Sequence, residues 1–367
     1  MTQPTIELAP IHSGHPVSRS LPTVDVVIPC YNYGHFLPGC VNSVLSQLGV
    51  DVRILIIDDS SPDDSAAVGQ HLATQHEAVT FRRHDTNKGH IATYNEGILD
   101  WSSSSYVVLL SADDMLAPGA LARAVSVMED DPSVGMVYGR TVHFHDEAQL
   151  ATVSAEPPGT RFTRYRGSDW LNKRLQAGNN VITSPEVVVR GSVHKAVGGY
   201  RKELPHSGDL EMWLRIAAIS DIAYLHHVQA YYRVHPSSMQ RTKYKTSLLD
   251  IVHRKAAFDL FAQHHQHLPG IAEMQQTVNR TLARESLWDA CRAYDHNRLS
   301  EANVEELVTF ATQAWPDYRR LPEYAALERR KRLGSTLCYR TQLFIIPASL
   351  RWIERKIKRT RMLREGI

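Results

Sequence analysis

Cysteine is scarce in this sequence, which has four among 367 residues. They are Cys30, Cys40, Cys291 and Cys338, and none belongs to a Cys-x-x-Cys pair. This spacing indicates neither a zinc site nor a dithiol redox motif. So few cysteines in a chain of this length are typical of a reducing compartment, and we expect a cytoplasmic protein.

Long apolar runs are also missing. No stretch of the sequence approaches the ~20 apolar residues that span a bilayer. The longest apolar run near the end, Leu343 to Ile346, is cut by Pro347. Residues 1–20 have no apolar core and therefore predict neither a signal peptide nor an anchor. We expect a flexible N-terminal arm over residues 1–21.

A strong excess of one charge is absent as well. Lys and Arg number 41 against 39 Asp and Glu, which gives a formal net charge of +2. This balance gives no support to nucleic-acid binding as the main activity. Hydrophobic residues make up 43% of the chain and charged residues 22%, which predicts an ordinary folded core.

Short apolar runs alternate with helical patterns over residues 24–142. The runs that predict strands are Val24–Pro29, Val52–Ile57, Val79–Arg83, Tyr106–Leu110 and Val134–Val142. Segments between them, such as Phe36–Gln47 and His90–Leu99, predict helices. The alternation indicates an α/β fold, a mostly parallel sheet with helices on both faces. Such sheets bind ligands beyond the carboxyl ends of their strands.

The second half of the chain is less regular. Gly208–Ile219 predicts a helix, while Pro185–Arg190 and Tyr224–Val234 predict extended segments. Beyond these, nearly all residues favour helix. We therefore expect a helical C-terminal region over residues 241–367.

Asp58 and Asp59 follow the second predicted strand directly. A carboxylate at this position can accept a hydrogen bond from a base or ribose edge. The alternative is a cap on the next helix. Capping explains one aspartate well and two adjacent ones less well.

Asp113 and Asp114 follow the fourth predicted strand. Adjacent carboxylates at the tip of a buried strand repel each other unless a cation or hydrogen-bond donors neutralise them. Mg²⁺ and Mn²⁺ prefer oxygen ligands and commonly take one or two protein carboxylates plus substrate phosphates. A helix cap is again the alternative.

Two later segments carry further candidates. Asp209 follows a glycine at the start of an apolar helix, where an N-cap is the simpler interpretation and a general base the functional one. Arg233 and His235 lie on one side of an extended segment, from which they can reach a pyrophosphate or a metal ion. Ordinary surface residues explain this second pair equally well.

Taken in order, these segments resemble the family 2 glycosyltransferases of the GT-A fold. The motifs are Val-Ile-Pro-Cys-Tyr31-Asn32, Ser43-Val-Leu-Ser-Gln47, Ile-Asp58-Asp59-Ser-Ser-Pro-Asp63, Asn87-Lys-Gly89 with Tyr-Asn95-Glu-Gly97, Leu-Ser-Ala-Asp113-Asp114, and Gly208-Asp209 with Trp213-Leu-Arg215. Each is short, but their family order across residues 22–238 makes the match specific. The resemblance implies a GT-A catalytic domain over residues 22–240, with a nucleotide-sugar-binding half (22–142) and an acceptor-side half (143–240).

The resemblance also implies roles for the matching positions. Residues expected to contact the donor are Pro29, Tyr31, Asp59, Asn95, Asp113 and Arg233. Asp114 and His235 would bind a divalent metal ion, Mn²⁺ or Mg²⁺. Asp209 corresponds to the catalytic base that deprotonates the acceptor hydroxyl. The sugar of a nucleotide-diphosphate donor, expected to be a UDP-sugar, would be transferred in a single displacement that inverts the anomeric configuration.

The family resemblance further implies hexosyl or N-acetylhexosaminyl transfer to a glycan or glycolipid acceptor, in cell-surface polysaccharide or glycolipid synthesis. We nominate Asn179–Arg190 as the acceptor segment. Ser111 stands where many members have aspartate, and Gly208 where many have glutamate. These departures keep an alternative open: a non-catalytic nucleotide-sugar-binding or scaffold subunit of a glycan assembly complex. A nucleotidyltransferase would carry a glycine-rich loop after the first strand, and none is present.

The C-terminal residues 351–367 are basic, with seven Lys or Arg and two Glu. The segment before them is rich in aliphatic and aromatic residues, from Leu343 to Ile353. A basic helix with such residues suits an anionic membrane surface. We predict peripheral contact with the inner face of the plasma membrane. The alternative is that the apolar residues pack on the catalytic domain while the basic ones are solvated.

Overall fold

The computed structural model describes residues 6–8, 20–153, 159–236, 238 and 246–367. The chain divides into two compact units. The first, here called the sheet unit, runs up to Leu171 and includes Val181–His235 and Gly366. The second, the helical unit, comprises Asn172–Asn180, Pro236–Glu365 and Ile367. Most of the predicted N-terminal arm lies outside the described residues.

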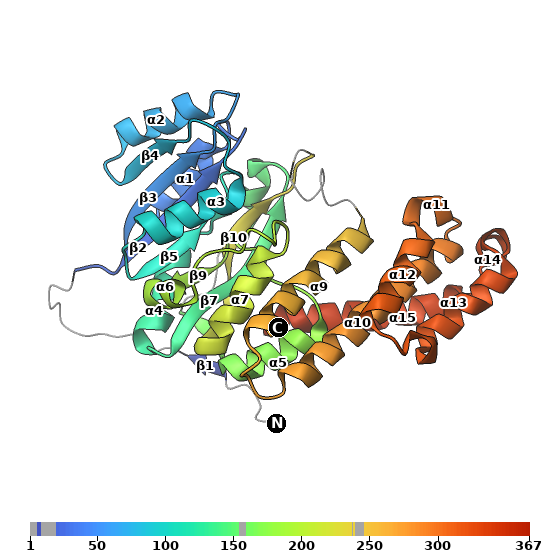
Figure 1. Ribbon diagram of the computed structural model, residues 1–367. Helices are drawn as coiled ribbons and strands as arrows, with labels where there is room; N and C mark the ends of the chain where they lie inside the picture. Colours follow the sequence, from blue (N-terminus) through green and yellow to red (C-terminus); the bar gives the residue numbers. More distant parts are fainter. Residues whose placement is uncertain (1–5, 9–19, 154–158, 237, 239–245) are drawn as a thin grey trace. The chain divides into compact units, whose positions relative to one another are not determined.

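Among the described residues, ten strands form one sheet in the sheet unit (Figure 1). They are β1 (Ile6–Leu8), β2 (Thr23–Cys30), β3 (Asp51–Asp58), β4 (Val79–Arg83), β5 (Tyr106–Leu109), β6 (Met115–Leu116), β7 (Val134–Phe144), β8 (Arg161–Tyr165), β9 (Val188–Arg190) and β10 (Asp221–Arg233). Their spatial order is β1-β8-β10-β7-β9-β5-β2-β3-β4, and β6 pairs with β10.

Strands β4, β3, β2 and β5 are parallel to one another, as the alternating pattern predicts. Their central residues, among them Val26, Ile28 and Ile56, are fully buried, because a strand covered on both faces has to be apolar throughout. Beyond β5 the sheet is mixed. Strand β9 runs antiparallel to both β5 and β7, while β7 and β10 are parallel. The expected mostly parallel sheet is therefore confirmed for the N-terminal strands and gives way to a mixed arrangement after them.

Helices cover both faces of the sheet. Those that accompany its strands are α1 (Leu37–Leu45), α2 (Ser65–Gln75), α3 (His90–Asn95), α4 (Ala120–Asp130), α5 (Gly167–Ala177), α6 (Gly191–Val197) and α7 (Gly208–Ile219), with the π-helix η1 (Glu96–Trp101) and the 3-10 helix η2 (Glu147–Thr152). On one face, Val24 and Val26 of β2 share a core with α1 and α4. On the other face η1 lies against β2, since a Cβ on Gly97 would come within 2.2 Å of Val27 Cγ1.

Two predicted elements differ from the sequence expectation. The helix expected over residues 90–99 ends as an α-helix at Asn95 and continues as η1, where Ser102 N–H donates to Gly97 O. Such π-helical turns are frequent at functional sites. The strand expected from Pro185 is shortened to β9. The chain before it turns, with Val187 N–H donating to Ser184 O and Ser184 at a φ of 84°.

The helical unit confirms the helical character predicted for the C-terminal region. Its helices are α9 (Ser247–His264), α10 (Ile271–Asp295), α11 (Leu299–Ala302), α12 (Val304–Ala314), η3 (Tyr318–Arg320), α13 (Pro322–Leu333), α14 (Ser335–Thr341) and α15 (Ile345–Glu365). Helix α10 contacts α9, α12 and α13 and buries Val278, Leu282 and Leu287. No helix in the described part of the chain combines the length and apolar character that a bilayer crossing requires.

Candidate functional site

The ends of β2 and β3 lie side by side at the carboxyl edge of the sheet. Pro29 pairs with Ile57 in the parallel register, and Asp59 N–H donates to Cys30 O over 2.9 Å. Tyr31 follows on the loop and is 46% exposed, whereas Asp59 is buried. The structure therefore brings together three of the predicted donor-binding residues, Pro29, Tyr31 and Asp59.

The adjacent aspartates after β3 have different environments. Asp58 is fully buried, and Ser61 N–H donates to its carboxylate at 3.3 and 3.4 Å. The Nε atom of Arg83 lies 3.3 Å from the same carboxylate. Asp58 thus stabilises the turn after its own strand and does not cap α2, which begins at Ser65.

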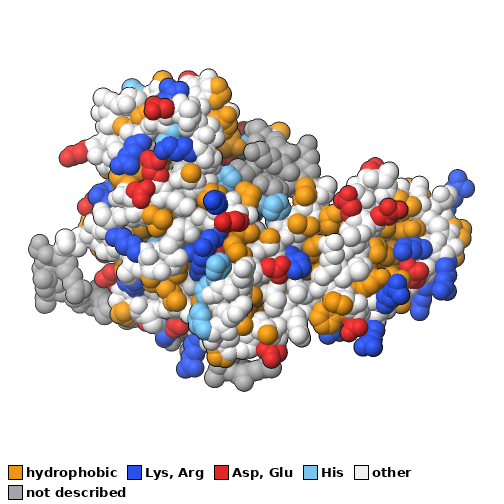
Figure 2. All heavy atoms as spheres, viewed as in Figure 1, with side chains coloured by type: hydrophobic (Ala, Val, Ile, Leu, Met, Phe, Trp, Pro, Cys, Tyr) orange, Lys and Arg blue, Asp and Glu red, His pale blue; other side chains and the backbone are white. Residues whose placement is uncertain are grey.

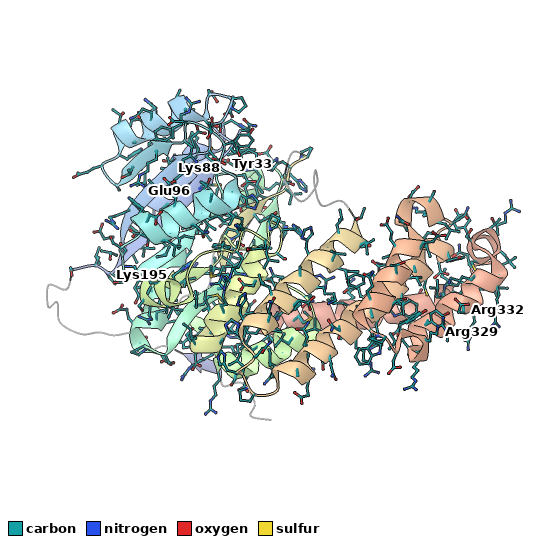
Figure 3. All side chains as sticks on the ribbon, viewed as in Figure 1. Tyr33, Lys88, Glu96, Lys195, Arg329 and Arg332 are labelled. Atoms are coloured by element: carbon teal, nitrogen blue, oxygen red, sulfur yellow. The ribbon has the colours of Figure 1, made fainter. Side chains whose placement is uncertain are left out.

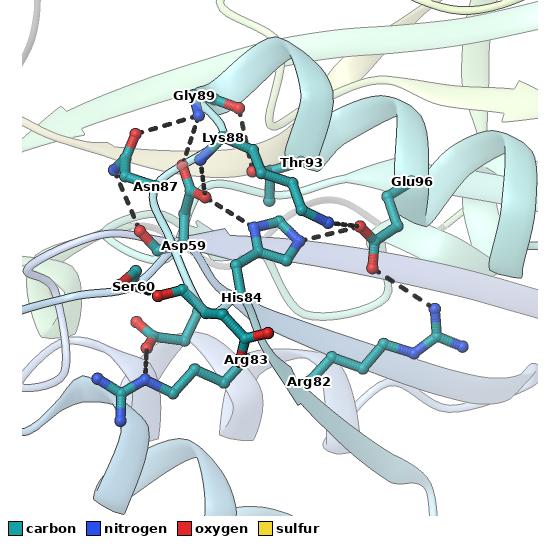
Figure 4. Close-up of polar contacts among 12 residues, drawn as sticks. Asp59, Ser60, Arg82, Arg83, His84, Asn87, Lys88, Gly89, Thr93 and Glu96 are labelled. Carbon is teal, nitrogen blue, oxygen red and sulfur yellow. Dashed lines mark hydrogen bonds and ion pairs between the residues drawn. The ribbon is translucent and has the colours of Figure 1, made fainter.

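Asp59 lies at the centre of a hydrogen-bond network between β3, β4 and the loop before α3 (Figure 4). Its Oδ1 accepts from Lys88 N–H at 2.8 Å, and its Oδ2 accepts from Gly89 N–H at 2.9 Å. His84 Nδ1 lies 2.7 Å from Asp59 Oδ1, and His84 Nε2 lies 2.9 Å from Glu96 Oε2. The Asp59 carboxylate is therefore held in one orientation.

The second acidic pair lies in the turn between β5 and β6. Burial and the neighbouring charge of Asp113 raise the pKa of the Asp114 carboxyl well above its usual range. Asp114 is 2% exposed, and its Oδ1 accepts from Arg233 N–H at 2.9 Å. A buried carboxylate beside a like charge is stabilised by a proton or by a cation.

Arg233 contacts this acidic turn from the end of β10. Its Nε donates to Asp113 O over 2.9 Å, and a terminal nitrogen donates to Glu147 Oε1 over 2.6 Å. The guanidinium lies 4.4 Å from the ring centroid of Phe36 and 4.5 Å from that of Phe144, within cation–π range. Arg233 thus holds the acidic turn in place. Its predicted contact with the donor diphosphate stays a prediction.

His235 follows β10 and faces the same turn. Its Nε2 lies 3.0 Å from Asp113 Oδ2, and its ring packs against Tyr33 at a centroid separation of 5.3 Å. Burial and the charges of Asp113 and Asp114 raise the pKa of the Tyr33 phenol to about 12. Figure 3 shows Tyr33 at the same end of the sheet unit as Lys88 and Glu96. The two predicted metal ligands, Asp114 and His235, therefore border one turn.

The oxygen and imidazole ligands at this turn are of the kind that bind a hard divalent cation. Two adjacent carboxylates lie there, the imidazole of His235 contacts the carboxylate of Asp113, and the burial of Asp114 beside a like charge favours a neutralising cation. Among the described residues, no three His, Cys, Asp or Glu side chains are grouped as a complete metal site. A donor phosphate can supply the remaining ligands, as is common for Mg²⁺ sites. The residues predicted to hold the ion are Asp114 and His235, with Asp113 beside both of them.

Asp209 lies in the first turn of α7. Ser207 occupies the N-cap position, so the interpretation of Asp209 as the N-cap residue is wrong. Asp209 Oδ1 accepts from Leu210 N–H at 2.7 Å, and Oδ2 lies 3.5 Å from Ser184 Oγ. The side chain is half-buried and lies in the first turn of the helix, near the positive end of its dipole.

Tyr94 and Tyr232 are each influenced by the charges of both the acidic turn and Asp209. Burial and the charges of Asp113, Asp209 and Asp114 raise the pKa of Tyr94. Burial and the charges of Asp114, Asp113 and Asp209 also raise the pKa of Tyr232. Because charges act on a titrating group mainly at short range, the acidic turn and Asp209 border one region of the sheet unit.

Asn95 is turned toward the protein backbone. Its Nδ2 donates to Tyr200 O over 2.9 Å, and its Oδ1 accepts from Tyr200 N–H over 2.7 Å. This pair ties α3 to the loop before α7 and places the Tyr94 and Tyr200 rings 5.6 Å apart. Asn95 therefore fixes the position of α3 relative to the loop before α7. Its predicted contact with the donor stays a prediction.

Sequence reasoning missed several buried polar side chains near these residues. Glu186, in the nominated acceptor segment, is 3% exposed and accepts from Thr183 N–H and Oγ1, both at 2.7 Å. Its charge contributes to the raised pKa of Asp114. His84 lies buried between Asp59 and Glu96. The sequence does offer one indication of these residues. His84 directly follows strand β4, and Glu186 lies just before the apolar strand β9.

A family comparison decides the class of the sheet unit. Residues 25–188 match the model of glycosyl transferase family 2. The chain carries a family 2 glycosyltransferase domain. The match includes both acidic pairs and ends before Asp209. The predicted family and enzyme class, a glycosyltransferase, are confirmed.

Solved structures share the fold of this chain, and a curated relative is similar to part of it. S. aureus TarS in complex with UDP has a TM-score of 0.58 at 14% identity, covering 87% of this chain and 92% of that one. The mannosyltransferase PcManGT from Pyrobaculum calidifontis, in complex with GDP-Man and Mn²⁺, has a TM-score of 0.54 at 15% identity, covering 92% and 89%. These likenesses confirm the expected GT-A fold. Chondroitin synthase of Escherichia coli is 23% identical over 211 residues, which are 57% of this chain and 29% of that protein.

Proposed function

We propose that this glycosyltransferase moves a hexosyl or N-acetylhexosaminyl group from a UDP-sugar to an acceptor hydroxyl, with inversion at the anomeric carbon. The observation that carries the proposal is that the charges of Asp113, Asp114 and Asp209 all help to raise the pKa of Tyr94 and of Tyr232. A candidate base therefore lies in the same region of the sheet unit as the acidic turn, which is suited to a donor diphosphate.

The donor is assigned to residues 22–142 and to the end of β10. Tyr31 and Asp59 contact the base, and Pro29 lies at the end of β2, just before the loop that carries Tyr31. Asp113 contacts the ribose or the metal shell, while Asn95 and Arg233 support the sugar diphosphate from the side. In support of this assignment, Pro29, Tyr31, Asp59, Asp113 and Arg233 lie at or just beyond the ends of β2, β3, β5 and β10, at the edge where α/β folds bind their ligands.

A divalent ion, Mn²⁺ or Mg²⁺, is assigned to Asp114 and His235. When bound, such an ion neutralises charge on the leaving diphosphate. Asp113 keeps His235 at the turn through the 3.0 Å contact, and Arg233 N–H fixes the orientation of the Asp114 carboxylate. The PcManGT complex with Mn²⁺ is consistent with a metal in a protein of this fold.

Asp209 acts as the general base of the transfer. Its Oδ1 accepts from Leu210 N–H, and its carboxylate takes the proton of the acceptor hydroxyl. The acceptor oxygen then bonds to the anomeric carbon as the bond from that carbon to the diphosphate oxygen breaks. The nucleoside diphosphate leaves with the bonding electron pair. Attack from the face opposite the leaving group inverts the configuration in one step.

The acceptor is assigned to residues 143–240 and is proposed to be a glycan or glycolipid of a cell-surface polysaccharide or glycolipid pathway. The likeness to chondroitin synthase supports a polysaccharide context. Ser184, in the nominated segment Asn179–Arg190, lies beside Asp209 Oδ2. This places a hydroxyl of that segment next to the carboxylate that would receive the acceptor proton.

The test is turnover of a panel of UDP- and GDP-sugars in the presence of Mn²⁺, with the product configuration read by NMR. We expect cleavage of one donor class, either by transfer or by slow hydrolysis, with inversion. A retained configuration would contradict the role of Asp209. Donor binding without any turnover, across a broad acceptor set, would favour the alternative of a non-catalytic nucleotide-sugar-binding or scaffold subunit.

We also propose that the helical unit contacts the anionic inner face of the plasma membrane. Exposed apolar side chains on and beside α14 include Leu337, Tyr339 and Leu343. Arg329 and Arg332 project nearby from α13, as Figure 3 shows. Apolar and basic side chains lie together on this unit in Figure 2. Basic residues near an anionic bilayer contribute about 1 kcal/mol each.

Flotation of the full chain with anionic and neutral liposomes tests this contact. A variant with Leu337→Gln and Leu343→Gln should lose most of its partition into the anionic fraction. The control is Leu48→Gln, which changes an exposed leucine of the sheet unit. Equal flotation of all three proteins would show that this surface does not dock. The test does not require substitutions in the basic C-terminal residues 351–367.

A further inference from the structure

We propose that His84, held by Glu96, sets the base selectivity and the pH dependence of nucleotide binding by restricting Asp59 to a single free acceptor position. This inference rests on the proposed role of Asp59 in binding the donor base. It concerns two residues, His84 and Glu96, that the proposed mechanism does not otherwise use.

The hydrogen bonds of Asp59 use most of its acceptor capacity. A carboxylate has about four lone-pair positions, two on each oxygen. Oδ1 accepts from Lys88 N–H at 2.8 Å and faces His84 Nδ1 at 2.7 Å, so both of its positions are occupied. Oδ2 accepts from Gly89 N–H at 2.9 Å. One acceptor position on Oδ2 therefore remains for a ligand.

A single acceptor position distinguishes between bases. Uracil presents one N–H on its pairing edge, at N3, whereas guanine presents two neighbouring donors, at N1 and N2. A carboxylate with both oxygens open binds guanine through two parallel bonds. The Asp59 carboxylate, with Oδ1 occupied, matches uracil and leaves the second guanine donor unpaired. An unpaired donor in a desolvated site weakens binding.

The geometry also indicates the charge of His84. Its two ring nitrogens lie 2.7 Å from Asp59 Oδ1 and 2.9 Å from Glu96 Oε2, and ionised carboxylates only accept hydrogen bonds. Both nitrogens therefore have to donate, which requires the doubly protonated imidazolium. Although burial opposes ionisation of Glu96, hydrogen bonds from Lys88 and His84 lower its pKa. Glu96 is thus the charged acceptor that this arrangement needs.

Charged groups lie around His84 on β3, on β4, on the loop after β4 and on η1. Facing groups are Asp59 and Asp58 at the end of β3, Arg82 and Arg83 on β4, Asp85 and Lys88 on the following loop, and Glu96 on η1. His84 also lines a cavity of about 380 Å³ together with Arg82, Lys88 and Glu96. Although the ring itself is buried, this cavity connects its surroundings with solvent, so the ring can exchange its proton.

Loss of one proton from His84 breaks one of its two bonds. If Nδ1 loses the proton, Asp59 Oδ1 faces a lone pair and the carboxylate is released. If Nε2 loses it, the ring is repelled by Glu96 and no longer held. In either case the orientation of Asp59 is weakened. Affinity for a uracil nucleotide should therefore be lower at a pH where His84 no longer donates through both nitrogens.

Glu96→Gln separates this account from a purely structural role. The amide of glutamine can donate to Nε2, so a neutral imidazole can keep its Nδ1 proton on Asp59. The variant should bind UDP with near wild-type affinity at low pH. Its affinity for UDP should stay at that level at higher pH, where the affinity of wild type decreases. The second variant, His84→Ala, opens Oδ1. It should weaken UDP binding about tenfold, the cost of one charge-assisted bond, and narrow the preference for UDP over GDP.

The experiment is titration calorimetry of UDP and GDP, with Mn²⁺, across a pH series for wild type, Glu96→Gln, His84→Ala and the control His71→Ala, which changes an exposed histidine of α2. The terminal phosphate of UDP titrates in the same range. It does so equally for every protein, so ratios of Kd between proteins report on the protein alone. Melting curves establish that each variant is folded.

The outcomes distinguish this proposal from the proposed function. A UDP preference in wild type, with a pH profile flattened by Glu96→Gln and unchanged by His71→Ala, supports both. UDP binding with the same pH profile in wild type and Glu96→Gln overturns the role of His84 and leaves the donor role of Asp59 standing. Absence of UDP and GDP binding by wild type overturns both.

Discussion

The carboxylate of Asp114 accepts a hydrogen bond from the backbone N–H of Arg233 over 2.9 Å. This bond joins the turn after β5 to the end of β10. Because the donor is a main-chain group, substitution of the Arg233 side chain leaves it in place. The acidic turn is therefore positioned by the sheet itself. A substitution of Asp114 then tests the chemical role of its carboxylate rather than the position of the turn.

Replacement of Asp209 by asparagine should lower turnover without weakening the binding of the donor. A general base contributes about 10²–10⁴-fold to the rate, and an interaction used only in the transition state affects kcat. Steady-state kinetics with the active donor gives kcat, and calorimetry gives the donor Kd. Asp169→Asn is the matched control, since Asp169 is an exposed carboxylate in the first turn of α5. Near-normal kcat in a destabilised Asp209→Asn protein would mean that Asp209 only stabilises α7.

Gly97→Ala should destabilise the sheet unit by about 1–3 kcal/mol, the usual cost of overpacking. The added Cβ would lie 2.2 Å from Val27 Cγ1, in the centre of the sheet. Gly208→Ala is the control, because its Cβ would meet Tyr200 Cδ1 at an ordinary 3.5 Å. Urea unfolding of both variants measures the difference. A stable Gly97→Ala protein would show that η1 can move away from β2.

Glu186→Gln should change how stability depends on pH. Burial raises the pKa of Glu186 in the folded protein. The folded state therefore binds more protons than the unfolded state, and this residue makes stability fall as pH rises above about 4.3. The amide cannot ionise, so the variant should gain stability relative to wild type at higher pH. Urea unfolding at about pH 5 and about pH 8 tests this. An equal stability difference at both values would contradict the shift.

The strands of the N-terminal half could be predicted because β2, β3 and β5 are covered on both faces. Such strands are largely apolar, and the polar residues that follow them mark the carboxyl edge. That pattern predicts Asp59 and Asp113 at the edge of the sheet where the candidate site lies. The C-terminal helices followed in the same way from composition.

The remaining features depend on contacts between distant residues. His84 and Asp59 are 25 positions apart, and Asp114 and Arg233 are 119 apart. No local pattern encodes such pairs. The insertion of β9 between β5 and β7 likewise depends on tertiary packing. The inward turn of Asn95 onto the Tyr200 backbone has the same origin, which is why a donor role was the simpler prediction for its amide.

The most direct test of the central claim, that the acidic turn holds the donor diphosphate through a metal ion, is the thermal shift produced by UDP with and without Mn²⁺. A ligand at 100 times its Kd stabilises the folded state by about 2.7 kcal/mol. Wild type should melt higher with UDP and Mn²⁺ together than with either alone. Asp114→Asn should fold normally, since it removes a buried charge, and should lose the Mn²⁺-dependent part of the shift. An undiminished Mn²⁺-dependent shift in that variant would contradict the account.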